Sequence, residues 1–123
     1  MLNAGELDIT IPQGSDFNIP FQVLDVNNDA VSINGATIRG QIRKKVESAD
    51  IIATFTGSIV DGPNGEGLLS LTAAQTAAIP ADNSGQCNRK QTCYAWDAEI
   101  VFNDGVVMRI LQGQAYLDPE VTR

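Results

Sequence analysis

Two carboxylates near the C-terminal third of the chain have a spacing that permits chemistry. Asp97 and Glu99 lie two residues apart, which places both side chains on one face of a β-strand. A pair of carboxylates on one face can share a proton in acid–base work or bind a hard cation. They alternate with Trp96, Ala98 and Ile100, however, as the solvated face of a half-buried strand does. We therefore expect a solvated face.

A second acidic group resembles the opening of a calcium loop. Asp25, Asn27 and Asp29 stand at alternate positions, as the first ligands of such loops do. The glycine required at the sixth position is replaced by Ala30, and Ala36 occupies the place of the bidentate glutamate. These side chains also bond their own backbone in turns, so we expect a turn here.

The composition argues against catalysis. The sequence contains no histidine, which removes the commonest general base and the commonest transition-metal ligand. The glycines fall in turns, and none forms a phosphate-binding loop ahead of a helix. We expect no enzymatic activity, no cofactor and no metal.

The two cysteines, Cys87 and Cys93, lie in the segment GQCNRKQTCYAWD. Their spacing is neither a redox CxxC nor part of a zinc set. A disulfide between them is possible if the segment folds back on itself, and it would add on the order of 2 kcal/mol because the closed loop is short. A reduced pair is the alternative in a reducing cytoplasm.

Three aromatic residues near the cysteines suggest a possible binding platform. Tyr94, Trp96 and Phe102 would form one on a glycan-binding module if they were exposed. Since they alternate at strand spacing beside Ile100, we expect them in the core.

Charge limits the classes of partner. The formal net charge is −7, whereas binding to nucleic acid needs clustered Lys and Arg. The basic residues Arg39, Arg43, Lys44 and Lys45 do cluster, and we interpret them as a solvated strand end. No apolar stretch approaches the roughly 20 residues that span a bilayer, and the N-terminus lacks the features of a secretory signal. We expect no nucleic acid and no membrane as partners.

The elements that position these residues are mostly strands. Apolar and polar residues alternate over 7–12, 17–23, 38–43, 94–102 and 107–117, and turn residues separate these segments. The last two segments flank Asn103-Asp104-Gly105 and form a hairpin. At 123 residues the chain has the length of one domain, 1–123. The pattern predicts an all-β sandwich or barrel.

One segment is helical. In LLSLTAAQTAAIPAD, Thr72 and Gln75 have the spacing of a capping box, and the alanines that follow favour a helix. Pro80 ends it near Ile79. We expect a short crossover helix near residues 73–79.

Proline marks one strand as an edge. Pro20 has no N–H for a central ladder, so its strand lies at a sheet edge or contains a bulge. Edge strands can accept a strand from a neighbouring protein. We take Phe17, Asn18, Ile19 and Pro20 as a candidate interaction edge.

A succession of motifs resembles a known family. The chain contains, in order, ITIPQGSDFNIPFQVLD, GATIRGQIRKK, GEGLLSLTAAQTAAIPA and YAWDAEIVFNDGVVMRILQGQAYLDPEVTR. Over nearly the whole chain these resemble a family of small tailed-bacteriophage structural proteins, whose C-terminal pattern is matched here by Gln112-Gly113 and by residues 118–123. The chain departs from this family at residues 82–93, which are longer than the usual tight turn.

The resemblance implies a function without catalysis. Members of the family resemble the immunoglobulin-like N-terminal domain of upper baseplate proteins that anchor receptor-binding fibres. The resemblance therefore implies an immunoglobulin-like antiparallel β-sandwich and a virion protein assembled in the host cytoplasm, in the baseplate, tail or fibre-attachment region. Its partners would be other virion proteins in a symmetric, multi-copy assembly, with termini 1–6 and 118–123 as extended arms. A capsid cement or head-decoration protein is the alternative, and a glycan-binding module is a more distant one.

Overall fold

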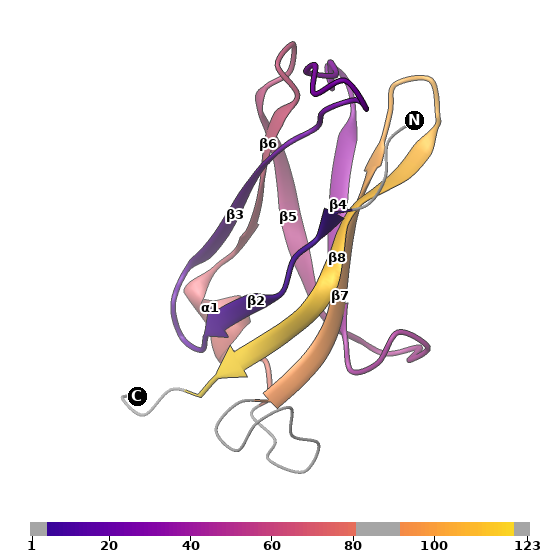
Figure 1. The fold of residues 1–123 in the computed structure, drawn as a ribbon. Coiled ribbons are helices and arrows are strands. Elements are labelled where there is room, and N and C mark those ends of the chain that lie inside the picture. The colour runs from indigo at the N-terminus through magenta and orange to yellow at the C-terminus, as the bar shows by residue number, and fades with distance from the viewer. Residues whose placement is uncertain (1–4, 81–91, 120–123) are drawn as a thin grey trace.

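The computed structural model describes residues 5–80 and 92–119, and these form eight strands and one short helix (Figure 1). The all-β fold predicted from the sequence is confirmed. The elements are β1 Gly5–Glu6, β2 Ile9–Pro12, β3 Phe17–Gln22, β4 Thr37–Arg43, β5 Ile51–Asp61, β6 Glu66–Leu71, α1 Ala73–Ala77, β7 Thr92–Val101 and β8 Val107–Asp118. The described strands share one hydrophobic core, which extends from Ile9 to Leu117.

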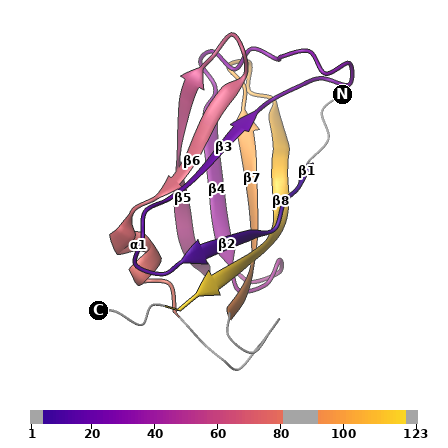
Figure 2. The ribbon, with the colours of Figure 1, turned by 60° about the vertical axis from the view of Figure 1, so that its left-hand side comes forward.

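The strands form one ladder that folds into two layers. Their order is β1-β8-β7-β4-β5-β6-β3, and β2 also pairs with β8. Strand β5 changes partner along its length: Thr56 pairs with Arg39 of β4 and with Ser70 of β6. The orders β3-β6-β5 and β4-β7-β8 correspond to B-E-D and C-F-G of an immunoglobulin-type sandwich, and the two views of the ribbon show the layers (Figures 1 and 2).

Gly57 permits the change of partner. It follows Thr56 directly, at the point where β5 leaves β4. A Cβ at this position would overlap the backbone carbonyl of Ile38 in β4. Only glycine lets the two strands lie this close where the layers separate.

The interior between the layers is apolar and closely packed. Strands β4 and β7 contribute alternate residues, and the rings of Phe55 and Trp96 lie 5.8 Å apart at an interplanar angle of 59°. The fully buried large side chains are Ile11, Ile33, Ile42, Leu69, Leu71, Ile79, Ile100, Leu117 and Thr76. Burial of this apolar surface is the main force that holds the layers together.

The N-terminal strand runs parallel to β8, which makes the ladder mixed rather than purely antiparallel. The sequence predicts one strand through Leu7, but Leu7 and Asp8 interrupt it between β1 and β2. The chain crosses Gly113 there, and the indole N–H of Trp96 donates to the Leu7 carbonyl at 2.9 Å. Gly5 and Glu6, predicted as part of an extended arm, instead pair with β8 within the chain.

Helix α1 is shorter than predicted, and its capping box is confirmed. Thr72 Oγ1 accepts from the Gln75 N–H at 3.2 Å, and Gln75 Oε1 accepts from the Thr72 N–H at 2.8 Å. The buried hydroxyl of Thr76 accepts from the Gly14 N–H and donates to the Ser15 carbonyl, which ties α1 to the turn between β2 and β3. No helix among the described residues has the length and apolar character to cross a bilayer.

We predict that Gly57→Ala lowers the free energy of unfolding by about 1–3 kcal/mol, because the new methyl group must displace the Ile38 backbone. Urea unfolding followed by fluorescence of Trp96 measures this change. Gly5→Ala is the matched control, since its Cβ would lie at an ordinary 3.4 Å from Leu111 Cδ2. Equal unfolding midpoints for the two variants would show that β5 does not need this close approach.

Candidate functional site

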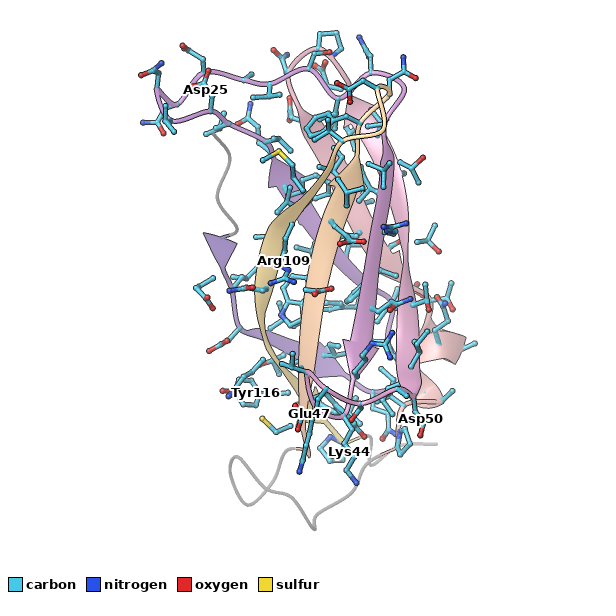
Figure 3. The ribbon with its side chains drawn as sticks, turned by 90° about the vertical axis from the view of Figure 1, so that its right-hand side faces the viewer. Asp25, Lys44, Glu47, Asp50, Arg109 and Tyr116 are labelled. Atoms are coloured by element: carbon cyan, nitrogen blue, oxygen red, sulfur yellow. The ribbon has the colours of Figure 1, made fainter. Side chains whose placement is uncertain are left out.

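The predicted carboxylate pair lies on the outer face of the β4-β7-β8 layer. In register, Glu99 of β7 is opposite Arg39 of β4, and its Oε1 lies 2.6 Å from both Nε and Nη2 of that arginine. Asp97 Oδ2 lies 3.5 Å from Nε of Arg109 on the other neighbour, β8. Figure 3 shows Arg109 midway along this face. Each carboxylate therefore has its own cation on a different strand.

This pairing supports a structural role for the two carboxylates. The arginine side chains are both 55% exposed, and the carboxylates are 32% and 46% exposed for Glu99 and Asp97. Exposed ion pairs of this kind contribute about 0–1 kcal/mol each. Each carboxylate is directed to an arginine of a neighbouring strand, so the predicted solvated face is the interpretation that fits.

The basic run at the end of β4 is used locally. Arg43 Nη1 donates to the carbonyls of Ser48 and Ala49, both at 2.8 Å, and thereby holds the loop between β4 and β5. Lys44 lies at the end of the molecule opposite Asp25 (Figure 3). Arg43 therefore holds a loop at the end of β4, which agrees with the interpretation of the basic residues as a strand end.

The acidic segment after β3 is a turn. Asp25 Oδ1 accepts from the N–H groups of Asn27, at 2.8 Å, and Asp29, at 3.0 Å. Asn28 has a positive φ of 65°, which asparagine tolerates in turns. The predicted turn is confirmed. Within residues 5–80 and 92–119, no cluster of three or more His, Cys, Asp or Glu side chains could hold a metal ion.

The aromatic residues Tyr94, Trp96 and Phe102 do not form an exposed binding platform. Trp96 is 3% exposed and Tyr94 is 6% exposed, and the Tyr94 hydroxyl donates to the Pro80 carbonyl. Phe102 is partly buried and packs against the core. The predicted core positions of Tyr94 and Trp96 are confirmed, and these two side chains are not accessible to a glycan, whereas Phe102 lies at the edge of the core.

Cys87, one of the two cysteines in the predicted disulfide, lies outside the described part of the chain. The pairing of Cys87 with Cys93 therefore stays a prediction. Cys93 is half-buried in β7, in register with Tyr116 of β8. Its Sγ lies 3.6 Å from Oε1 of Gln114.

The candidate edge lies at the end of the ladder, as Pro20 indicates. Among the described residues, only β6 pairs with β3. The Val23 N–H donates to the Gly65 carbonyl, which continues the register of β3 with β6. Because backbone groups alternate in direction along an antiparallel strand, the odd-numbered residues of β3 turn theirs toward β6. Asn18 and Gln22 therefore turn their N–H and C=O groups to the open side, where Pro20 offers a carbonyl alone.

An apolar groove lies on this open side, and the sequence did not reveal it. Its volume is about 240 Å³. It is lined by Gly5 of β1, by Phe21, Gln22, Val23 and Leu24 at the end of β3, and by Ile110 and Leu111 of β8. We call it the β3–β8 groove. Its two walls are far apart in the sequence, so alternation within either strand carries no signal that they face each other.

We predict that a double-mutant cycle on Arg39→Gln and Glu99→Gln gives a coupling energy below about 1 kcal/mol, because both side chains are partly exposed. The coupling should weaken in 1 M NaCl, where charges are screened within about 3 Å. Urea unfolding of the two single variants and the double variant measures it. A coupling above about 2 kcal/mol that resists salt would instead indicate a desolvated pair with a more specialised role.

Comparison with known proteins adds only distant likeness. No family model matches the sequence, and no curated protein matches it. The chain is similar to the crystal structure of CopC from Methylosinus trichosporium OB3b, at 9% identity over 94% of this chain and 88% of that chain, with a TM-score of 0.49. It is also similar to murine CRIg, at 10% identity over 90% of each chain and a TM-score of 0.35. A family 123 glycoside hydrolase from Clostridium perfringens matches at 15% identity over 99% of this chain and 24% of that chain, with a TM-score of 0.40. All three TM-scores are below one half, so the likenesses carry no conclusion about function.

Proposed function

We propose that this chain is a non-enzymatic structural protein of a tailed bacteriophage, which acts through repeated protein–protein interfaces in the baseplate, tail or fibre-attachment region. The order of its sequence motifs, from ITIPQGSDFNIPF to the C-terminal residues, supports a place in this family. The observation in the fold that carries the proposal is the open side of β3.

An open strand side suits a protein that assembles. Asn18 and Gln22 hold backbone groups that another chain can bond, and both side chains are exposed. Each such interface is modest in area. In a closed ring the contacts repeat around a symmetry axis. Because the contacts form together, the affinity of the whole assembly exceeds that of any single contact.

The outer face of the other layer fits the same role. Its charges are paired across β4, β7 and β8 by Arg39–Glu99 and Arg109–Asp97. Paired surface charges fix register and partner choice more than they add affinity. These four side chains can lie against a neighbouring subunit without becoming buried, unpaired charges.

We predict that cryo-electron microscopy of the intact phage particle will place this sandwich at the baseplate, tail or fibre roots, in several symmetry-related copies. The reason is that its binding groups serve repeated contacts rather than a reaction. Particles produced without the gene are the control, and they should lack the same density.

Two other outcomes would contradict the proposal in different ways. Density on the capsid lattice would show that the protein is a cement or head-decoration protein. Absence of the chain from purified particles, checked by mass spectrometry, would remove the virion role altogether.

A further inference from the structure

We propose that the β3–β8 groove binds an extended segment of a partner protein with alternating apolar and cationic side chains, which adds a strand to β3 at Gln22 and Leu24. This inference rests on the proposed function only in that both require a protein partner. It concerns one surface of the isolated chain and can be tested without a particle.

The backbone supplies two consecutive open positions. Gln22 turns its N–H and C=O away from β6, as the register of β3 requires. Leu24 forms an antiparallel bridge with Ala30, and the residues on either side of them make its hydrogen bonds. The Asp25 N–H donates to the Asp29 carbonyl, and the Val31 N–H donates to the Val23 carbonyl. The N–H and C=O of Leu24 therefore also face the open side. An added strand can pair at both positions.

The groove supplies the apolar contact. Gln22 and Leu24 line it together with Ile110 and Leu111 on the opposite wall. Leu24 is 38% exposed, so part of this apolar surface is in water. Successive side chains of an added strand point to opposite faces, and those on one face would enter the groove. This alternation determines the apolar half of the partner's pattern.

The charge around the groove determines the other half of the partner's side-chain pattern. The residues that line the groove include no Lys or Arg. Two acidic residues adjoin it: Asp25 follows Leu24, and Glu66 is opposite Gln22 in register. The nearby Arg109 is directed to Asp97 and Gln112 on the outer face. Lys or Arg on the exposed face of the added strand would complement these carboxylates.

A second copy of this chain is a poorer occupant of the groove. Each copy carries a formal charge of −7, so two acidic surfaces would repel each other. Pairing of β3 with its own copy would also bring in Pro20 of both strands, and each Pro20 lacks the N–H that the ladder needs. A basic partner segment that pairs beyond Pro20 meets neither obstacle.

The test uses the full chain and a synthetic hexapeptide that alternates valine and lysine, with a valine–glutamate hexapeptide as the charge control. In an NMR titration the lysine peptide should shift the amide signals of Gln22, Leu24 and Leu111. We expect the glutamate peptide to bind at least about tenfold more weakly, because it meets Asp25 and Glu66.

A matched pair of variants isolates the backbone contact. Gln22→Pro removes the open N–H but no bond to β6, as Pro20 already does in the same strand. Gln22→Ala removes the same side chain and keeps the N–H. We expect Gln22→Pro to weaken binding of the lysine peptide about tenfold or more, and Gln22→Ala to change it less than about threefold.

Hydrogen exchange of the unmodified protein keeps the test decisive if Gln22→Pro does not fold. The Gln22 amide should exchange quickly alone and become protected by the lysine peptide. The proposal is overturned if the lysine peptide causes no shift or protection at about 2 mM, a concentration that detects binding of only about −4 kcal/mol. It is also overturned if both peptides bind equally, if both variants bind equally, or if Gln22→Pro abolishes a self-association of the chain.

Discussion

The change of partner by β5 is the constraint on which the architecture depends. One half of this strand pairs with β4 and the other half with β6, and the ladder turns from one layer into the next at Thr56 and Gly57. A ladder folded at one such corner leaves its two ends facing each other on the far side. These ends are β3 and the pair of β1 and β8, and they are not joined by hydrogen bonds in the described residues. The corner thus creates both the enclosed core and the open groove.

Much of the fold follows from local signals in the sequence. Alternation from Tyr94 to Phe102 locates β7, because residues that face the core must recur at every second position. The capping box at Thr72 and Gln75 locates the start of α1, since both bonds are made within four residues. Pro20 correctly marks β3 as an edge strand, because a missing donor is tolerated only there. Each of these signals is complete within one short segment.

Features that depend on two distant segments were not predicted. The segment 51–60 shows no clear inward face because β5 changes neighbours, and only Phe55 in it is buried. The sequence also does not show that β2 runs parallel to β8, or that Leu7 must cross a glycine. Asp97 and Glu99 were correctly placed on one face, but their arginine partners come from strands on either side. The β3–β8 groove also depends on distant segments, since β3 and β8 face each other only in the folded chain.

The parallel pairing of β2 with β8 has a consequence for synthesis. Glu6 and Gln112, which are bonded through their side chains, lie 106 positions apart. During translation, Ile9 and Ile11 leave the ribosome long before Ala115 and Leu117, against which their strand pairs. At ordinary elongation rates this delay is on the order of 5–20 s. Through that interval the N-terminal strand has no partner on β8, so its unpaired backbone groups are open to aggregation or chaperone binding until β8 emerges.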